Sequence, residues 1–530
     1  MYTIRGKFLR AGLVGAAICL ISGALSGFDM KIKDQFDIEE MTVMEMQDAM
    51  KSGKVTSKQL VRMYLDRIRQ IDGKLNSIIE INPDAIKIAE QMDKERAAGK
   101  VRSMMHGIPL VIKDNIDTAD KMKTTAGSLA LVDAPTPKQD AFVVKQMRAA
   151  GAVLIGKTNL SEWANFRSEN SSSGWSGRGG QTHNPYILDR SPCGSSSGSG
   201  VAAAANLTAV AVGTETDGSV VCPASINGIV GIKPTLGLVS RSGIIPIAHS
   251  QDTAGPMART VTDAVILLNA MVGMDSTDSI TSHFAGKGEK DYTKFLDKTG
   301  LKGARIGVVR QYFGKNPALD SLMEENLKKL ENAGATIVDV EFPHFRGYGD
   351  DEYEVLLYEF KADLNKYLQA RGVKYNSLEK LIEFNKQNAA RSMPYFGQEI
   401  FEKAQAKEDL NDSGYKLALM TSKVLTQDKG IDAVMDKHKL DALVAPSNSQ
   451  SWLIDLIMGD SPTNYVGSSS LAAVSGYPNI TVPSGFLNEM PIGMSFFGRA
   501  FSEPTLIKIA YSWEQASNAR QKPKYLETYR

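Results

Sequence analysis

Three segments of the chain carry residues that could together perform nucleophilic catalysis. Ser219 ends a loop with the sequence GTETDGS, and Ser195 lies in an upstream serine-rich loop with the sequence GSSSGSG. Lys113 follows a short apolar run much earlier in the chain. A hydroxyl becomes a nucleophile only when a neighbouring base removes its proton. These segments could therefore supply a nucleophile, a second hydroxyl that relays protons, and a lysine base.

The base is the decisive question for such a site. Histidine is the usual partner of a serine nucleophile, but none of the six histidines lies in a pattern that marks a base. The G-x-S-x-G pattern of α/β-hydrolases does occur around Ser196, yet a segment so rich in serine and glycine matches it by chance. A lysine serves instead if burial without a carboxylate partner lowers its pKa from about 10.4. The apolar residues before Lys113 favour burial, and the alternative is a surface lysine at the end of a strand.

The complete pattern resembles the amidase-signature family. Besides the lysine and the two serine loops, family motifs occur in the family's order: NPY at 184–186, GIKPT at 231–235, SQDTAGP at 250–256 and GYPN at 476–479. The resemblance covers residues 36 to 520 and implies one α/β/α domain around a large mixed sheet, here bounded as residues 36–525. It also implies an amidase, a hydrolase that cleaves linear amides through an acyl-enzyme intermediate.

The resemblance also assigns roles to individual residues. Ser219 corresponds to the serine that is acylated, and Lys113 to the base. Ser195 corresponds to the middle serine, which follows a cis peptide bond in this family. The backbone N–H groups that correspond to the oxyanion hole are those of Thr216, Asp217, Gly218 and Ser219.

Supporting roles are expected for three further residues. Ser196 and Asp114 could orient the relay by hydrogen bonding, and Arg190 could brace the Ser195 loop. Trp163 and Phe166 could line a substrate pocket or belong to the core.

Three positions depart from the usual family pattern. Cys193, Ser197 and Asp217 stand where glycine is usual. The Asp217 form resembles the branch that includes bacterial peptide amidases, which remove a C-terminal amide from peptides. A carboxylate that faces a developing oxyanion would disfavour it, so we expect the Asp217 side chain to turn away.

Apolar runs and helical patterns alternate along the chain, which predicts an α/β sheet covered by helices on both faces. Strands are expected at 108–112, 152–155, 209–212, 306–309, 337–340, 443–445, 480–482 and 494–497. Helices are expected at 56–68, 140–148, 319–333 and 504–519. The segment 353–429 is expected to be mainly helical, either as a cap over a cleft or as outer-layer helices. Residues 171–180, rich in serine and glycine, resemble a flexible loop.

The N-terminus has a targeting pattern. Arg5, Lys7 and Arg10 precede an apolar run over 11–25, which predicts a signal peptide of residues 1–26 and a protein exported to the periplasm or secreted. An uncleaved N-terminal anchor is the alternative. After cleavage Cys193 and Cys222 remain, either as a disulfide or as two buried thiols.

Composition narrows the partners. The formal net charge of +1 indicates neither a nucleic-acid surface nor, once the signal peptide is cleaved, a membrane surface. Neither metal-ligand spacing nor a nucleotide fingerprint occurs, so we expect no metal and no cofactor. The expected substrate is a small amide or a peptide amide. The alternatives are an amidotransferase subunit of the same family, which works in the cytosol, and an exported peptide-binding protein.

Overall fold

The computed structural model describes residues 36–529. The expected signal peptide, residues 1–26, lies outside the described residues. The chain forms one compact unit from Ile38 onward. No helix among the described residues is both long enough and apolar enough to cross a membrane.

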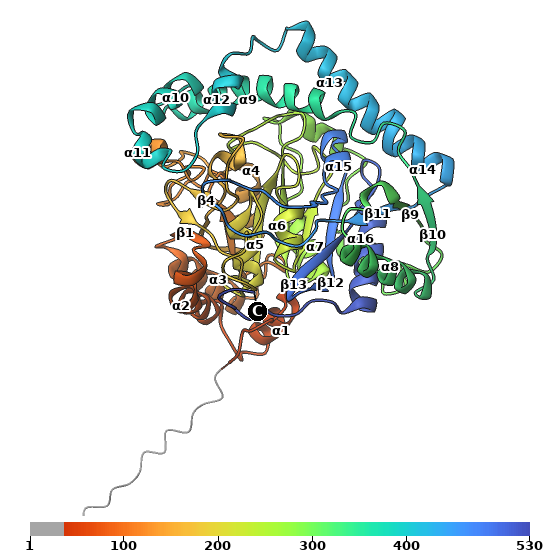
Figure 1. The fold of residues 1–530 in the computed structure, drawn as a ribbon. Helices are drawn as coiled ribbons and strands as arrows, with labels where there is room; N and C mark the ends of the chain where they lie inside the picture. The colour runs from red at the N-terminus through yellow and green to blue at the C-terminus, as the bar shows by residue number, and fades with distance from the viewer. Residues whose placement is uncertain (1–35, 530) are drawn as a thin grey trace, which may run out of the picture. The chain divides into compact units, whose positions relative to one another are not determined.

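An eleven-stranded mixed sheet forms the centre of this unit (Figure 1). Its strand order is β1-β3-β2-β6-β8-β7-β12-β13-β11-β9-β10. The strands are β1 (Ile78–Ile81), β2 (Pro109–Lys113), β3 (Val153–Thr158), β6 (Val210–Glu215), β7 (Val230–Lys233), β8 (Thr253–Ala258), β9 (Arg305–Val309), β10 (Thr336–Val340), β11 (Ala442–Pro446), β12 (Asn479–Leu487) and β13 (Met490–Phe497). A separate small hairpin pairs β4 (Trp175–Ser176) with β5 (Gly180–Gln181).

The pairing of β2 with β6 positions the chemistry. These two strands run parallel, with Ile112 opposite Val212, so Lys113 and Thr214 both lie at the carboxyl ends of their strands. The other neighbour of β2 is β3, which runs parallel to it. The other neighbour of β6 is β8, which runs antiparallel to it. In α/β sheets the carboxyl ends of parallel strands are the usual place for a ligand site.

Helices cover both faces of the sheet, as the alternating pattern predicts. They are α1 (Val43–Lys51), α2 (Ser57–Leu75), α3 (Ala85–Ala97), α4 (Phe142–Ala149), α5 (Ser197–Ala204), α6 (Val221–Ile226), α7 (Val261–Asn269), α8 (Pro317–Asn332), α9 (Gly349–Arg371), α10 (Leu378–Gln387), α11 (Ala389–Ser392), α12 (Glu399–Gln405), α13 (Ser413–Thr426), α14 (Asp432–His438), α15 (Ser470–Ser475) and α16 (Glu503–Ser517). The α2 helix begins with the capping box of Thr56 and Gln59 that its sequence indicates.

The helix α5, which follows the Ser195 loop directly, is wholly buried. Its glycines let it approach the backbone of other segments. A Cβ at Gly198 would lie 2.3 Å from the carbonyl oxygen of Ser77 and 2.5 Å from that of Asn159. Only glycine fits there, so the serine-rich loop is held at a fixed depth above the sheet.

All eight expected strands are present, with three differences elsewhere. β3 continues through Gly156 to Thr158 instead of stopping at the glycine. Five further strands were not expected: β1, β7, β8 and the hairpin of β4 and β5, which lies largely in the segment 171–180 expected to be a flexible loop. Glycine interrupts the apolar pattern of β7, and glycine and proline interrupt that of β8. The helix expected at 140–148 begins at Phe142, because the Asp140 carboxylate accepts the N–H of Ala119 instead of capping the helix.

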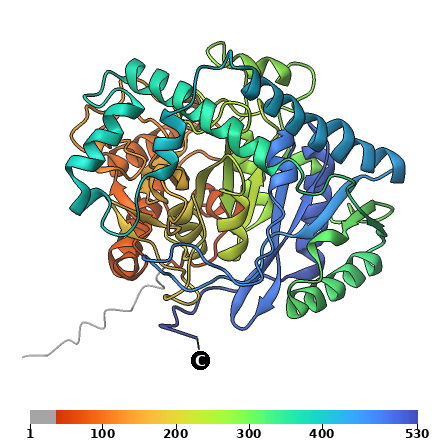
Figure 2. The ribbon, with the colours of Figure 1, turned by 45° about the horizontal axis from the view of Figure 1, so that its top comes forward.

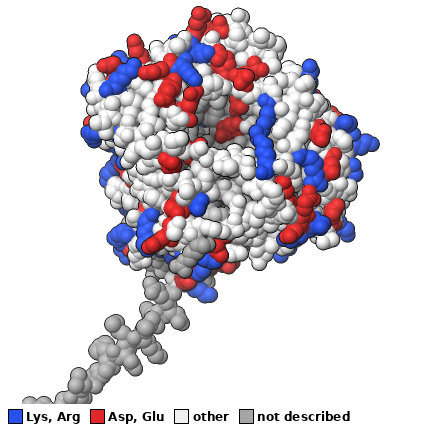
Figure 3. Space-filling model, viewed as in Figure 1, with Lys and Arg blue, Asp and Glu red and all other residues white. Residues whose placement is uncertain are grey.

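The segment 353–429 forms the helices from α9 to α13, which arch over one end of the sheet (Figures 1 and 2). Residues of α9 line both cavities described below. Of the two alternatives, at least this helix therefore acts as a cap over the site and is not only an outer-layer helix. The molecular face in Figure 3 is hollowed near its centre, and acidic side chains lie in and beside the hollow.

Candidate active site

Lys113 and Ser195 are in direct contact at the carboxyl edge of the sheet. The Lys113 Nζ lies 2.7 Å from the Ser195 Oγ, and both side chains are fully buried. The peptide bond between Gly194 and Ser195 is cis. The two residues are far apart in the sequence and meet because β2 ends beside the Ser195 loop.

Thr214 orients the lysine, a role that motif reading missed. The Lys113 Nζ lies 2.9 Å from the Thr214 Oγ1 and 3.3 Å from its carbonyl oxygen. The Asn115 side-chain amide donates to the same Oγ1 at 2.9 Å. A neutral amine has two N–H donors and one lone pair. With both N–H groups directed at Thr214, the lone pair is left for the Ser195 hydroxyl proton.

Ser196 supports this arrangement from below. Its hydroxyl donates to the Thr214 carbonyl oxygen at 3.0 Å and accepts the Thr214 N–H at 3.1 Å. Ser196 therefore orients Lys113 only indirectly, because it holds Thr214 in place.

The electrostatic setting of Lys113 suits a base. Burial lowers its pKa from 10.5 to about 7, although Asp252 and Glu215 oppose the shift. The hydrogen-bond partners of Lys113 among the described residues are neutral oxygens of Ser195 and Thr214, and desolvation without a counter-charge in contact disfavours the ammonium form. A neutral amine is therefore well populated near pH 7.

The Ser219 loop is joined to the Ser195 loop through the backbone. The Ser196 N–H donates to the Ser219 carbonyl oxygen at 3.2 Å. The Glu215 carboxylate accepts the N–H groups of Val220 and Val221 at 2.8 and 3.0 Å, which fixes the turn into α6. Ser219 is 9% exposed, so its side chain is largely shielded from bulk water.

The backbone donors of this loop are available. The N–H groups of Thr216, Asp217, Gly218 and Ser219 donate to no other group in the described part of the chain. Gly218 adopts a φ of +78°, a conformation that glycine reaches without strain. Four consecutive free donors that end at a serine have the form of an oxyanion hole.

Asp252, in the SQDTAGP motif, anchors the same loop from the other side. Its carboxylate accepts the Thr216 hydroxyl at 2.6 Å and the backbone N–H groups of Ile247 and Ala248 at 2.8 and 2.9 Å. Burial raises the pKa of Asp252 to about 7, against the effect of these hydrogen bonds. Sequence reading used this motif only as a family mark and gave the aspartate no role.

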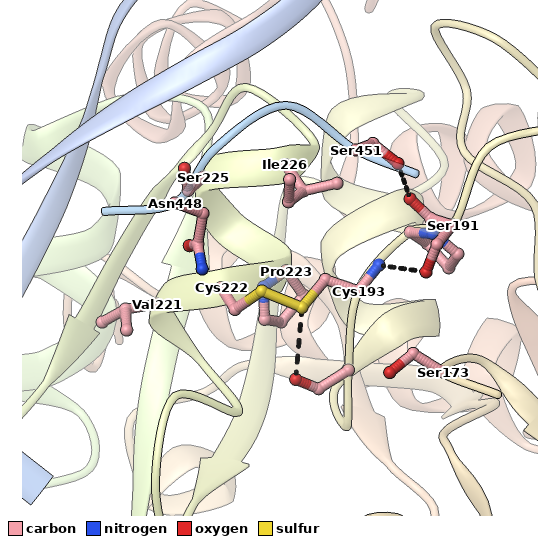
Figure 4. The surroundings of a disulfide bond; sticks show 12 residues. Ser173, Ser191, Cys193, Val221, Cys222, Pro223, Ser225, Ile226, Asn448 and Ser451 are labelled. Carbon is pink, nitrogen blue, oxygen red and sulfur yellow. Dashed lines mark hydrogen bonds between the residues drawn. A yellow bond between two sulfur atoms is a disulfide. The ribbon is translucent and has the colours of Figure 1, made fainter. Parts of the chain in front are cut away.

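A disulfide links the two serine loops (Figure 4). Cys193 lies two residues before Ser195 and Cys222 three residues after Ser219, with a Cα–Cα distance of 6.1 Å. The structure thus favours the disulfide over two free thiols. Cys193 has a φ of +54°, the region where glycine is favoured, which agrees with the family's usual glycine at this position.

Two of the expected supporting residues lie elsewhere. Asp114 points away from Lys113, because neighbouring strand residues face opposite sides, and its carboxylate bonds with Thr125 and Arg178. Arg190 lies 3.2 Å from the Asp189 carboxylate and stacks over Tyr529, so its guanidinium does not brace the Ser195 loop.

The two aromatic residues belong to the core. Trp163 and Phe166 are 2% and 7% exposed and pack edge-on against Phe401 and Phe360. They therefore support the site from behind and do not line either cavity.

Two cavities flank the serine loops. The relay cavity, of about 270 Å³, is lined by Ser195, Thr214 and Thr216 together with apolar residues of 244–247. The carboxylate cavity, of about 550 Å³, is lined by Gly194, Asp217, Gly218, Tyr348 and Glu352, among others. The Asp217 side chain thus turns into the second cavity and away from Lys113.

One group of side chains among the described residues has the spacing of metal ligands. Candidate ligand atoms of His249, Glu359 and Asp363 lie within 4.8 Å of one another. Burial disfavours the imidazolium, but the hydrogen bond that His249 donates to Asp363 and the charge of Glu359 outweigh it and raise the pKa of His249. The imidazolium therefore forms ion pairs with both carboxylates.

Comparison with known proteins gives one consistent answer. The family model described as Amidase matches residues 59–507. A probable amidase from Arabidopsis thaliana is 41% identical over 521 residues, which cover 96% of each chain. A glutamyl-tRNA(Gln) amidotransferase subunit from Thermoanaerobacter pseudethanolicus is 32% identical, and the match covers 92% of this chain and 99% of the relative.

Solved structures agree with these matches. The native peptide amidase from Stenotrophomonas maltophilia is 48% identical, with a TM-score of 0.88, and covers 92% of this chain and 99% of its own. The peptide amidase PAM in complex with the competitive inhibitor chymostatin is 49% identical, with a TM-score of 0.89 and the same coverage. The chain therefore belongs to the amidase family, whose members hydrolyse carbon–nitrogen bonds in amides.

Proposed function

We propose that this amidase removes the C-terminal amide of peptides, and that Ser219, Ser195 and Lys113 carry out the reaction. The contact between a buried, uncompensated lysine and a serine hydroxyl, 2.7 Å between Nζ and Oγ, is the observation that carries the proposal. Such a pair has one evident chemical use, because a buried lysine with a lowered pKa accepts protons near neutral pH.

The reaction proceeds in two halves. Neutral Lys113 accepts the Ser195 hydroxyl proton while Ser195 accepts the proton of Ser219, whose Oγ bonds to the amide carbon. The N–H groups of Thr216, Asp217, Gly218 and Ser219 form the oxyanion hole, in which one donor typically contributes about 3 kcal/mol. The relay then returns the proton to the nitrogen, the C–N bond breaks and ammonia leaves. Water, deprotonated through the same relay, hydrolyses the acyl-enzyme and restores the Ser219 hydroxyl.

Two observations support a peptide substrate over other amides. The peptide amidase PAM, whose structure contains a competitive inhibitor, is 49% identical to this chain. The carboxylate cavity, of about 550 Å³, is large enough for more than a simple amide and is lined by polar groups suited to a peptide backbone.

Active-site labelling tests the assignment. The protein is treated with a fluorophosphonate, and adducts are located by fragment mass spectrometry. We expect an adduct on Ser219 that is lost in Lys113→Met and kept in Lys423→Met. Lys423 is a suitable control because it too is largely buried, with its pKa lowered by burial to about 8, but it bonds with the carbonyl oxygens of Ser250 and Val474. An unlabelled Ser219 in a folded protein that hydrolyses no amide would overturn the proposal.

The amidotransferase alternative has its own support in the similarity to glutamyl-tRNA(Gln) amidotransferase chains. It predicts glutamine-dependent release of ammonia and no hydrolysis of peptide amides. Ammonia assays with glutamine and with a dipeptide amide as separate substrates distinguish the two.

Export to the periplasm or the medium is part of the proposal. It is supported by the basic-then-apolar pattern of residues 1–26 and by the disulfide, which persists in oxidising compartments. N-terminal sequencing of the protein recovered from each fraction tests it, with cleavage before Gly27 as the expected result. An intact N-terminus in a cytosolic fraction would contradict it.

A further inference from the structure

The carboxylate cavity contains a pair of acidic side chains beside the proposed nucleophile. Asp217 lies two residues before Ser219, and its Oδ2 accepts the Ser470 hydroxyl at 2.7 Å. Its Oδ1 is buried and, apart from the Glu352 carboxyl described below, has no hydrogen-bond partner in the described residues. A carboxylate has lone pairs for about four donors, so Asp217 retains acceptor capacity.

Glu352, on α9, is the second member of the pair. Burial and the neighbouring Asp217 charge raise the pKa of Glu352 well above its ordinary value, and its carboxyl hydrogen-bonds with Asp217. The Gln251 side-chain amide donates to the Glu352 Oε1 at 2.9 Å, which fixes its orientation. Glu352 thus holds the proton of the pair, and Asp217 is the member that can accept from a ligand.

Tyr348 gives an independent indication of a ligand. Its side chain lines the same cavity and is 1% exposed, and its hydroxyl has no hydrogen-bond partner among the described residues. An unpaired buried hydroxyl costs free energy unless a ligand completes it. The cavity therefore presents an acceptor, Asp217, and a donor, Tyr348, which is the pairing that a peptide unit requires.

We propose that Asp217 selects α-amino-acyl amides by accepting the N–H or ammonium group adjacent to the scissile carbonyl, while Tyr348 donates to the carbonyl that precedes it. This inference rests on the proposed function and names the substrate class of the same site. The α-nitrogen of an amino-acid amide is two bonds from the carbon that Ser219 attacks, and Asp217 belongs to the same loop as Ser219 and lines the carboxylate cavity. Fatty and aryl amides lack this N–H.

The substrate N–H or ammonium group that binds Asp217 also favours formation of the tetrahedral intermediate. A carboxylate close to the oxyanion hole disfavours the tetrahedral intermediate. An N–H or ammonium group that binds Asp217 offsets that charge, and does so most where the oxyanion develops. The effect should therefore appear in kcat as well as in KM.

A single-atom substitution in the substrate tests the proposal. The probes are N-acetyl-phenylalanine amide and its depsi analogue, in which an ester oxygen replaces the α-N–H. Released ammonia is measured for each, so that cleavage of the ester does not count. We expect kcat/KM to be about 10- to 100-fold higher for the N–H probe in the wild-type protein, as for a hydrogen bond to a charged group.

Two variants assign that preference to Asp217. Asp217→Asn removes the charge and should bring the ratio of the two probes to within about threefold, whatever its effect on the overall rate. Glu352→Gln keeps a neutral donor beside Asp217 and should keep the ratio. Because each ratio is taken within one protein, partial misfolding cancels.

The outcomes are distinct. Equal efficiency with both probes in the wild-type protein, or an unchanged ratio in Asp217→Asn, would overturn the inference and leave the proposed function in place. Hydrolysis of neither probe would overturn the proposed function and the inference together.

Discussion

The two sides of the Ser219 loop bury ionisable groups in opposite ways. On one side Lys113 contacts only neutral oxygens, those of Ser195 and Thr214, and its pKa falls to about 7. On the other side Asp217 has Ser470 as a donor and a neighbour, Glu352, that takes up the proton. The difference shows that burial alone does not determine a group's role. A buried lysine without a counter-charge can act as a base, whereas a carboxylate beside a protonated partner can act as a hydrogen-bond acceptor.

The largest expected effect comes from fixing the charge on the base side. Lys113→Arg keeps a cation and its donors but cannot deprotonate at accessible pH. We expect kcat/KM for a peptide amide to fall by at least about 1,000-fold, as for loss of a general base. The fall should persist at pH 9, where Lys113 of the wild-type protein is neutral because its pKa is lowered to about 7. Activity within about tenfold of the wild type would remove Lys113 from the mechanism.

Next in size is the disulfide, which joins the two sides. Cys193→Ser with Cys222→Ser opens a link with a sequence separation of 29. We expect the free energy of unfolding to fall by about 3 kcal/mol, measured by urea titration. Activity should fall as well, because the two serines lie on the linked loops. Unchanged stability and activity would mean that the loops are held by α5 and the sheet alone.

The pH profile follows from the pKa of Lys113. The base must be neutral, so kcat/KM should rise with pH and level off above about 7, and at pH 5.5 it should be about 30-fold below the plateau. The Asp252 charge raises the pKa of Lys113, so Asp252→Asn should move the midpoint to lower pH. A flat profile from pH 5 to 9 would contradict a neutral-lysine base.

A smaller effect is expected from Thr214→Val, which removes one oxygen that orients the amine. Loss of this hydrogen bond should lower kcat about tenfold and leave KM for the amide nearly unchanged. Thr216→Val serves as the comparison, since its hydroxyl contacts Asp252 instead of Lys113. A Thr214→Val effect confined to KM would place Thr214 in substrate binding.

The smallest effect marks the boundary of the site. Arg190→Ala should change kcat/KM by less than about twofold, because its guanidinium faces Asp189 and Tyr529 on the surface. A loss of tenfold or more would restore a role in bracing the Ser195 loop.

Sequence patterns predict the fold well because the sheet depends on local apolar runs. They fail at β7 and β8, where glycine and proline break the pattern and tertiary pairing decides. Lys113, Ser195 and Ser219 could be identified because they lie in motifs. Glu352 could not, since its proximity to Asp217 arises from the path of α9 over the cavity, which no local pattern encodes. Strand alternation predicts that Asp114 faces away from Lys113, which agrees with the bonds of its carboxylate to Thr125 and Arg178.

Because of the course of α9, the lining of the substrate cavities and the residues of proton transfer lie partly on different segments of the chain. The helix brings Glu352 to the carboxylate cavity and Asp363, Lys366 and Tyr367 to the relay cavity, while other residues of α9 face solvent. The proposed proton-transfer residues lie at the end of β2 and on the two serine loops, and in α5, which follows one of these loops, a Cβ at Gly198 would collide with the backbone. Substitutions on α9 can therefore change the substrate preference without disturbing the segments that hold the proton-transfer residues.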